Sequence, residues 1–237
     1  MELAEYALMD AAEDHMWWYR ALHRRLIQAL AEVHGAVLDA GCGTGGLLAR
    51  LGAERAELWP VGVEWAGPAS RRAAAKSRAP VVRGSVNALP FAAASFDAAV
   101  AADVLCHAAV DPSLALDELR RVLRVGGRLV VNMPAYAWLI SAHDRQVHNV
   151  RRCTARGLAA MLRDAGFVRV RARYWNSLLL PLMVVQRKLL ARDAQGSDVA
   201  VFPPWLDATL RVMTEIEHRL PIRFPAGGSV LATAERP

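Results

Sequence analysis

The sequence predicts an α/β protein with a doubly wound, mostly parallel sheet. Short apolar runs, typical of buried strands, alternate along the chain with segments of helical spacing. Parallel strands need crossover connections, which are usually helices, so this alternation indicates βαβ units. In addition, the stretch VLDAGCGTGG (37–46) places an aspartate and a glycine cluster between a strand and a helix. Ligands that contain a nucleotide bind at such turns in doubly wound folds.

The length and composition fit one domain with added elements. Of the 237 residues, 54% are hydrophobic and 22% are charged, so a sizeable core can be buried. Cys42, Cys106 and Cys153 lie far apart and form no CxxC pair, which argues against a structural zinc site and suits a reduced compartment. No secretory signal is visible, and no apolar run reaches the roughly 20 residues of a spanning helix. We therefore expect a cytoplasmic protein that at most contacts a membrane surface.

The formal charge of +6 is carried largely by arginine. A positive balance of this kind could favour nucleic acid, anionic lipid or acidic substrates. A high-GC genome, which enriches alanine and arginine together, would produce the same composition. The charge therefore leaves the class of partner open.

Seven strands are expected in the sheet. Most are short apolar runs, and the run at 168–175 alternates apolar and basic residues. The predicted strands are 36–39, 58–65, 80–85, 96–105, 128–134, 168–175 and 227–236.

The predicted helices have recognisable ends. Pro68 and Pro112 lie in first turns, where a missing N–H costs no hydrogen bond, and Thr154 is the expected N-cap of its helix. The Gly126–Gly127 pair is expected to end the helix that Pro112 begins. The predicted helical segments are 1–34, 45–51, 67–77, 112–127 and 154–167.

Residues 176–225 are expected to form a helical insert before the last strand, broken at GSD (196–198) and FPP (202–204). Much of this insert is apolar, as in WNSLLLPLMVVQRKLL (175–190). It could cover an acceptor pocket, form a homodimer face or rest on a membrane, and these alternatives remain open.

The glycine spacing alone allows two kinds of cofactor. Gly41, Gly43 and Gly46 fit the G-x-G-x-x-G pattern of dinucleotide-binding proteins. However, Asp39 lies two residues before the first glycine, where its carboxylate would repel a pyrophosphate and attract an ammonium group. Glu64, at the end of the second strand, can accept hydrogen bonds from both ribose hydroxyls. A ligand with an amino-acid end and a ribose but no diphosphate is S-adenosylmethionine.

Residues 36–132 resemble the class I S-adenosylmethionine-dependent methyltransferases, in particular a bacterial small-molecule subgroup. VLDAGCGTG resembles the first family motif, VGVEW the second, and GSVNALPFAAASFDAAVAADVLCH the third and fourth; LDELRRVLRVGGRLVV resembles the helix and strand that follow. The resemblance implies a Rossmann-like sheet and a single methyltransferase domain over 1–237. Its expected parts are a lid of N-terminal helices (1–34), the core (35–175 and 226–237) and the insert (176–225).

The resemblance also implies a set of cofactor-binding residues. Asp39 would orient the methionine end, glycines would let the backbone approach the ligand, Glu64 would bind the ribose, and Trp65 would lie against the adenine. The implied set is Asp39, Gly41, Cys42, Gly43, Glu64, Trp65, Ser85, Val86, Asn87, Ala102 and Asp103, with Trp18 and Arg20 from the N-terminal region.

Two positions depart from the family pattern. Ser85 stands where an acid usually contacts the adenine amino group, and a hydroxyl accepts that bond more weakly than a carboxylate. Cys106 replaces the glutamate of the common D-V-L-E-H sequence. Both changes concern the affinity for the cofactor more than its identity.

The acceptor is expected to meet aromatic residues from the N-terminal region. EDHMWWYRALHRRL (13–26) resembles the lid helix of small-molecule methyltransferases. Trp17, Trp18 and Tyr19 are consecutive, and neighbouring helix positions diverge by about 100°, so they cannot all face the core. Arg20 or Arg24 could then bind the cofactor carboxylate, although ordinary packing with solvated arginines is the alternative.

The loop after the fifth strand is the second expected acceptor region. SAHDRQVHNVRRCT (141–154) resembles an HD…H…RRY segment of some bacterial methyltransferases and follows a strand end, where open α/β sheets bind substrates. A histidine there can deprotonate a hydroxyl or an amine. The candidate bases are His148, His143 and His107, and the candidate substrate-binding residues are Trp17, Tyr19, Tyr136, Asp144 and Arg152. We expect no metal, although His143, Asp144 and His148 carry ligand atoms, and helix capping would also explain this loop.

The sequence therefore predicts an S-adenosylmethionine-dependent methyltransferase for a small, apolar or bulky acceptor, with transfer to oxygen favoured. Alignment of acceptor, methyl and sulfur supplies most of the rate, so no catalytic residue is required. An RNA methyltransferase is an alternative that the charge suggests, but no RNA-binding appendage or N/D-P-P-Y/F signature is present. A catalytically degenerate cofactor-binding scaffold or partner subunit is a further alternative.

Overall fold

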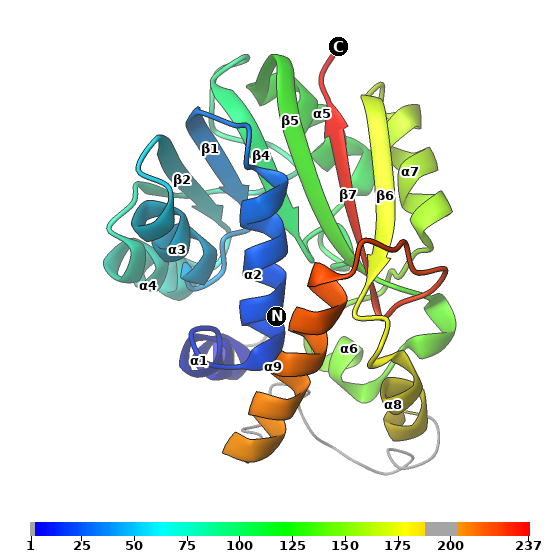
Figure 1. Ribbon diagram of the computed structural model, residues 1–237. Coiled ribbons are helices and arrows are strands. Elements are labelled where there is room, and N and C mark those ends of the chain that lie inside the picture. The colour runs from blue at the N-terminus through cyan, green and yellow to red at the C-terminus, as the bar shows by residue number, and fades with distance from the viewer. Residues whose placement is uncertain (1–2, 188–202) are drawn as a thin grey trace.

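The structure is a computed structural model that describes residues 3–187 and 203–237. Within these residues seven strands form one sheet in the order β3-β2-β1-β4-β5-β7-β6 (Figure 1). The neighbouring strands from β3 to β5 are parallel, whereas β7 is antiparallel to both β5 and β6. The predicted mostly parallel, doubly wound sheet is therefore confirmed. The strands are β1 (Gly35–Ala40), β2 (Leu58–Glu64), β3 (Val81–Arg83), β4 (Phe96–Ala102), β5 (Leu123–Pro134), β6 (Val168–Trp175) and β7 (Ser229–Glu235).

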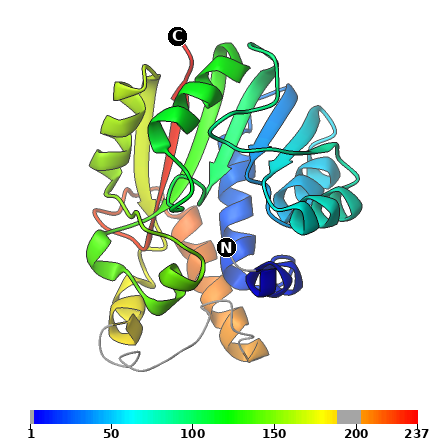
Figure 2. The same cartoon turned by 180° about the vertical axis from the view of Figure 1, so that it is seen from behind.

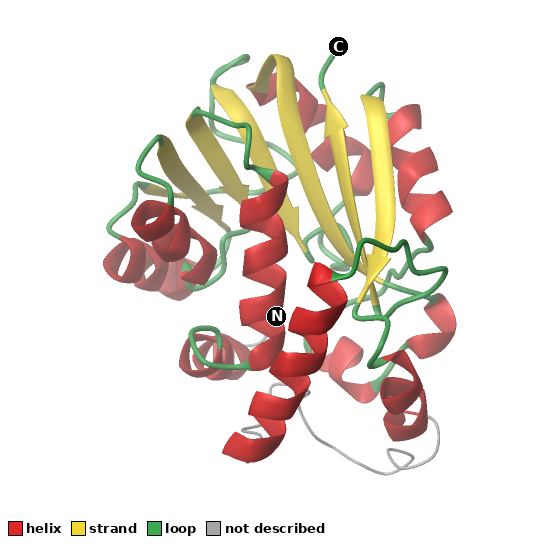
Figure 3. Cartoon of the chain, in the orientation of Figure 1, coloured by secondary structure: helices red, strands yellow, loops and turns green. Residues whose placement is uncertain are grey.

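Helices cover both faces of the sheet (Figures 1, 2 and 3). One apolar cluster joins the sheet to α2 and α3, and a second cluster joins the opposite face to α5 and α7. The helices are α1 (Leu3–Ala12), α2 (Trp17–Ala29), α3 (Gly46–Glu54), α4 (Gly67–Ser77), α5 (Pro112–Val122), α6 (Ala142–Gln146), α7 (Ala155–Asp164), α8 (Leu180–Val185) and α9 (Pro204–Arg219), with a 3-10 turn η1 (Ala137–Leu139).

The helix caps follow from short polar side chains. Thr154 caps α7, as predicted, by accepting a hydrogen bond from the Gly157 N–H at 3.0 Å. Asp111 caps α5 by accepting from the N–H groups of Ser113 and Leu114. Between α1 and α2, the N–H of Trp17 donates to Asp207 of α9 at 2.8 Å, so the first turn of α2 is capped from the far end of the sequence.

Several predicted boundaries were wrong. The helical segment 1–34 is divided into α1 and α2 by a turn at residues 13–15. The fourth strand ends at Ala102 and not at residue 105, because Asp103 adopts a left-handed conformation with φ of 54°. The fifth helix ends at Val122, not at the glycine pair, because Leu123 is already paired with Phe96 of β4. Tertiary pairing therefore outweighs the helical pattern of residues 123–127.

The insert lies between β6 and β7 and contains α8 and α9. The predicted break at GSD (196–198) and Phe202 of FPP lie outside the described residues, whereas Pro203 is the N-cap of α9 and Pro204 is its first residue. Glu217 of α9 is buried and accepts from the N–H groups of Asn176, Ser177 and Leu178, and it also pairs with Arg25 of α2 at 3.4 Å. These contacts fix α9 against α2 and the end of β6. In the part of the chain that the structure describes, no helix is long and apolar enough to cross a membrane.

Candidate functional site

A cavity of about 770 Å³ includes the ends of several strands and is bordered by α1, α2, α6 and α8. It brings together residues that the sequence analysis assigned to cofactor, acceptor and base. The predicted residues in its wall are Trp17, Trp18, Tyr19, Asp39, Gly41, Cys42, Gly43, Glu64, Trp65, Ser85, Val86, Asn87, Ala102, Asp103, His107, His143, Asp144, His148 and Arg152.

The glycine loop forms the floor of one part of the cavity. Gly41 has φ of 85°, and a Cβ there would lie 2.5 Å from Val104, so only glycine fits this turn. Asp39 is buried beside the loop, and its burial, together with the charges of Glu13 and Glu64, raises the pKa of its carboxyl group to about 7. A cationic ligand group would favour the ionised form of this carboxyl.

Glu64 joins the glycine loop to α1. Its Oε1 accepts from the Tyr6 hydroxyl at 3.0 Å and from the Ala66 N–H at 2.9 Å. Its Oε2 accepts from the Gly43 N–H at 3.0 Å. The Glu64 carboxylate, which is expected to bind the ribose, is therefore held in place by three donors, one of which comes from α1.

Glu13 is a residue of this region that the sequence analysis missed. It follows α1 and accepts from the Thr44 hydroxyl at 2.6 Å and from the Gly46 N–H at 3.1 Å, at the start of α3. Lys76 of α4 donates to the same carboxylate at 2.6 Å. Burial nevertheless raises the pKa of Glu13. Only the acidic residues near the end of the first helix hinted at this contact, and nothing in the sequence identified its partners.

The predicted adenine residues lie at one side of the cavity. Trp65 is 69% exposed, so a large aromatic face is accessible to a ligand. The Ser85 hydroxyl accepts from the Asn87 N–H at 3.2 Å, and Asn87 donates to the Ala109 carbonyl at 3.1 Å. Ser85 retains a further acceptor lone pair, since a hydroxyl oxygen has two.

Asp103 follows β4 and is supported by a buried polar network. Asn132 donates from Nδ2 to Asp103 Oδ1 at 3.0 Å, and Trp175 donates from Nε1 to Asn132 Oδ1 at 2.8 Å. Burial raises the pKa of Asp103 to about 7. A strained backbone and a fixed carboxyl group at a cavity wall are features that concentrate at functional sites.

The three consecutive aromatic residues of α2 all contribute to the cavity wall. Trp18 packs against Trp175 and Tyr19, and Trp17 packs against Leu179 of the insert. The Nε1 of Trp17 is buried without a hydrogen-bond partner among the described residues. His23, one turn beyond Tyr19, also lines the cavity, and burial lowers its pKa to about 3, so this ring is neutral. The sequence analysis did not identify His23, because its position on α2 resembles that of an ordinary core residue.

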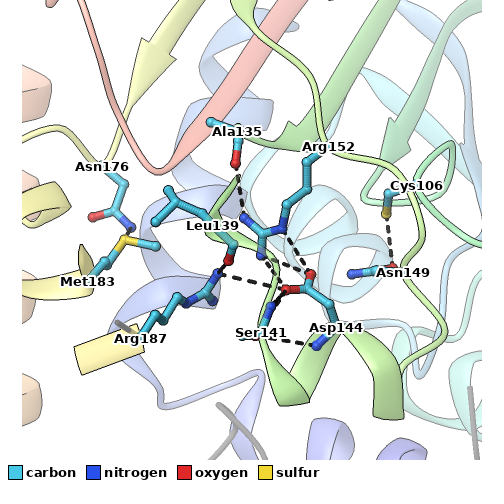
Figure 4. Close-up of polar contacts among 10 residues, drawn as sticks. All are labelled: Cys106, Ala135, Leu139, Ser141, Asp144, Asn149, Arg152, Asn176, Met183 and Arg187. Atoms are coloured by element: carbon cyan, nitrogen blue, oxygen red, sulfur yellow. Dashed lines mark hydrogen bonds and ion pairs between the residues drawn. The ribbon is translucent and has the colours of Figure 1, made fainter. Parts of the chain in front are cut away.

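Asp144 and Arg152 line the cavity but bind each other (Figure 4). Arg152 donates to both oxygens of Asp144 at 2.8 Å and to the Ala135 carbonyl at 3.0 Å. Asp144 also forms a capping box with Ser141 at the start of α6. Burial alone would raise the pKa of Asp144, but Arg152 and Ser141 outweigh it and lower this pKa. The pair therefore holds the loop in shape, and any contact with an acceptor would have to compete with it.

The three candidate histidines lie in the wall of the same cavity. His107 Nδ1 lies 3.0 Å from the Val147 carbonyl, so Nδ1 carries the proton, and burial lowers the pKa of His107 to about 4. His148 is exposed and has φ of 60°. Cys106, at the position of the usual glutamate, donates to Asn149 Oδ1 at 3.1 Å and so connects the turn after β4 to the histidine loop (Figure 4).

Three predicted residues lie outside the cavity wall. Arg24, the alternative to Arg20 for the cofactor carboxylate, pairs with Glu215 of α9. Arg20 is exposed on α2, and its backbone carbonyl accepts from Arg50 at 3.4 Å. Tyr136 stacks against Tyr174 and Trp138, with ring centroids 5.4 Å and 5.6 Å apart. Helix rotation explains the position of Arg20, since residues two apart on a helix point about 160° apart, and Trp18 and Leu22 on either side of Arg20 both line the cavity. No group of three or more His, Cys, Asp or Glu side chains in residues 3–187 and 203–237 could hold a metal ion.

Comparisons with known proteins agree with this geometry. Residues 38–131 match the methyltransferase domain family model. An uncharacterised 37.1 kDa transposon protein of Streptomyces fradiae is 36% identical over 182 residues, which cover 69% of this chain and 48% of that protein. A 24-methylenesterol C-methyltransferase of Oryza sativa is 31% identical over 132 residues, which cover 49% of this chain and 34% of that enzyme.

A solved structure from Thermotoga maritima, described as an S-adenosylmethionine-dependent methyltransferase and possible histamine N-methyltransferase, has a TM-score of 0.64. It is 18% identical, and the match covers 99% of this chain and 96% of that one, so it supports the fold alone. The chain spans about a third to a half of the length of the two curated relatives above. Motifs, matched domain and fold together show that this chain contains a class I, S-adenosylmethionine-dependent methyltransferase domain.

Proposed function

We propose that the chain transfers a methyl group from S-adenosylmethionine to a small, apolar or bulky acceptor, with a hydroxyl oxygen as the favoured target. One observation carries this proposal. A single cavity of about 770 Å³ contains the glycine loop, Glu64, the aromatic residues of α2 and the histidine loop. Pockets for one ligand range over about 300–1,000 Å³, so this volume suits a cofactor with a small acceptor beside it.

The cofactor half of the proposal rests on residues whose chemistry suits each part of S-adenosylmethionine. Asp39 is a buried carboxyl group whose ionised form a nearby ammonium group would favour, and Gly41 leaves space that a Cβ would fill. Glu64 offers two carboxylate oxygens for the ribose hydroxyls, and Trp65 offers an aromatic face for the adenine. When bound, the cofactor supplies an electrophilic methyl group, and these residues orient it.

The acceptor half rests on the apolar character of the remaining wall. Trp17, Trp18 and Tyr19 lie there with Leu22 and Met183, which belongs to the insert. This wall favours an acceptor that buries apolar surface. The similarity to a sterol C-methyltransferase supports an apolar acceptor, although it covers only a third of that enzyme. We also propose that α1 and α2 form the lid and that the insert closes the acceptor side.

The histidine loop supports an acceptor that must lose a proton. We propose His148 as the general base, with His143 beside it, because His148 is accessible from the cavity and is exposed. His107 is a weaker candidate, because burial lowers its pKa to about 4 and so reduces its affinity for a proton.

Two measurements test the proposal. Calorimetry with S-adenosylhomocysteine measures cofactor binding, and a coupled assay of homocysteine release measures turnover with a panel of phenols, prenyl alcohols, sterols and RNA. We expect binding, and turnover with at least one apolar alcohol. Turnover with RNA alone would instead support an RNA methyltransferase. Binding without turnover on any member of the panel would support a cofactor-binding scaffold.

A further inference from the structure

Helix α9 carries apolar residues on two opposite sides. Its inner side is buried against α2 and Leu179 through residues such as Leu210. Its outer side exposes Trp205, Val212 and Ile216, which are 70%, 54% and 50% exposed. These three are seven and four residues apart, so they lie in one line along the helix. Because these three residues are exposed, they contribute little to the packing of α9 onto the domain.

Further exposed apolar residues follow α9 in the chain. Leu220 and Ile222, which follow in the chain, are 40% and 56% exposed. We refer to Trp205, Val212, Ile216, Leu220 and Ile222 as the outer apolar face. In Figure 1, α9 lies beside α2, with its first turn at the same end of the molecule as α1 and α8. Contiguous exposed apolar residues of this kind mark an interaction surface more often than isolated ones do.

The exposed charged residues around the outer apolar face are all basic, and one of them, Arg219, pairs with the partly exposed Glu215. Among the exposed residues of 203–225, the charged side chains are Arg211, Arg219 and Arg223. The acids of this segment are not exposed, and each has a partner. Asp207 accepts from the Trp17 N–H, Glu215 pairs with Arg24 and Arg219, and Glu217 pairs with Arg25.

We propose that the outer apolar face of α9 docks on an anionic lipid bilayer. Tryptophan and aliphatic side chains enter the boundary between headgroups and acyl chains, while arginines at the margin attract anionic lipid. A second copy of the chain fits less well, because a two-fold contact through this face would bring its arginines toward those of the partner. The charge around the face therefore favours a bilayer.

The other helix of the insert also exposes apolar residues. Leu182 and Val185 of α8 are exposed, whereas Met183, between them in the sequence, lines the cavity. Helix α8 thus separates the cavity from an apolar exterior. An acceptor dissolved in the bilayer would have a short route to the cavity, and this last step rests on the proposed function.

Flotation with vesicles tests the docking surface. The full chain is mixed with vesicles of phosphatidylcholine alone, or of phosphatidylcholine with phosphatidylglycerol, and the bound fraction is measured. We expect binding to the anionic vesicles, weaker binding to the neutral ones, and loss of binding at high salt. The double variant Val212→Glu/Ile216→Glu should reduce the apparent affinity at least about tenfold, because it places two charges in the apolar boundary.

A matched variant tests whether vesicle binding depends on the outer apolar face or on exposed apolar residues anywhere on the surface. Val125→Glu/Leu114→Glu places the same charges at residues that are 76% and 52% exposed on β5 and α5, and it should bind like the unaltered chain. Calorimetry with S-adenosylhomocysteine confirms that each variant is folded, since none of these four residues lines the cavity. The flotation assay requires no methyl transfer, so failure of the proposed acceptor would not change its result.

Three outcomes would overturn the proposal. The first is that the unaltered chain fails to bind anionic vesicles, and the second is that Val212→Glu/Ile216→Glu binds as well as the unaltered chain. The third is that light scattering shows a dimer that this double variant converts to a monomer, because the face would then be covered by a second copy.

Discussion

The hydroxyl of Tyr6 donates to Glu64 Oε1 at 3.0 Å, which places α1 on the carboxylate proposed to bind the ribose. The N–H groups of Ala66 and Gly43 occupy two further acceptor sites of the same carboxylate. A carboxylate has about four such sites, so one remains, whereas a ribose diol needs two. Cofactor binding at Glu64 therefore requires Tyr6 to release it.

Tyr6→Phe should tighten the binding of S-adenosylhomocysteine by roughly three- to tenfold, because a net hydrogen bond of about 1 kcal/mol from Tyr6 no longer competes with the ribose for Glu64.

Glu64→Ala should weaken binding of the same ligand by about 2 kcal/mol or more, since it removes a charge-assisted bidentate acceptor. Calorimetry at fixed salt measures both. Weaker binding by Tyr6→Phe would mean that Tyr6 contacts the cofactor, and displacement of the ligand by NAD at similar concentration would contradict the cofactor assignment.

Ser85→Asp should also tighten cofactor binding. One oxygen of the new carboxylate can keep the hydrogen bond from the Asn87 N–H, and the other can accept from the adenine amino group. Ser85→Ala, which removes the acceptor, is the matched control and should weaken binding. A dissociation constant for Ser85→Asp that is unchanged or larger would show that this position does not face the adenine.

The affinity for S-adenosylhomocysteine should rise with pH and level off above about pH 7.5. The Asp39 carboxyl has a pKa of about 7 in the protein, so it is largely protonated below pH 7. An ammonium group favours the ionised form, so binding in this range should release a proton. Calorimetry in buffers of different ionisation enthalpy measures how many protons are released on binding. Asp39→Asn should abolish this release. A pH-independent affinity would remove Asp39 from the ammonium site.

The raised pKa of Asp39 should also affect the stability of the fold. Cofactor affinity is expected to rise with pH, whereas the free energy of unfolding is expected to fall. The unfolded chain releases the Asp39 proton near pH 4, before the folded chain does, so the folded state binds more protons between about pH 4 and 7. This carboxyl group should therefore lower the free energy of unfolding as the pH rises through that range. Asp39→Asn should remove this part of the pH dependence in denaturant titrations.

Arg152→Ala should lower the free energy of unfolding by roughly 3–5 kcal/mol, because it leaves the buried carboxylate of Asp144 without its partner. Both side chains are almost fully buried, at 4% and 2% exposed. The matched control is Arg169→Ala, which breaks an exposed pair with Glu235 of similar length, 2.7 Å, and should cost only a small part of that loss. Equal losses would show that the Asp144–Arg152 pair does not support the loop.

His148→Asn should lower turnover roughly 100-fold if His148 is the general base. Asparagine is the better replacement, because His148 has φ of 60°, a conformation that asparagine adopts more readily than alanine. Turnover with the acceptor found in the panel, the melting temperature and cofactor affinity are measured on one preparation. A lower melting temperature with unchanged turnover would assign His148 to the shape of the loop and not to catalysis.

Local sequence patterns predicted the sheet because each pattern depends only on residues within one strand, helix or turn. The glycine loop, the acidic residue at the end of β2 and the alternation of strands with helices are short-range features, and each appears where expected. The boundaries at Asp103 and Leu123 were wrong for the opposite reason, since each depends on a neighbouring strand that is distant in sequence.

In the candidate site, too, some features follow from local sequence patterns and others depend on the tertiary structure. The sequence by itself determined that Asp39, the glycines and Glu64 lie together, because the carboxyl ends of parallel strands meet at one edge of the sheet. It also placed His107 and the histidine loop at that edge. Only the tertiary structure decided what those side chains do there. Tyr6 of α1 contacts Glu64, and Glu13, just after α1, contacts the glycine loop. Asp144 is bound by Arg152, and the outer face of α9 remains exposed. Such contacts join segments with no shared periodicity, and the packing of whole helices determines which of them form.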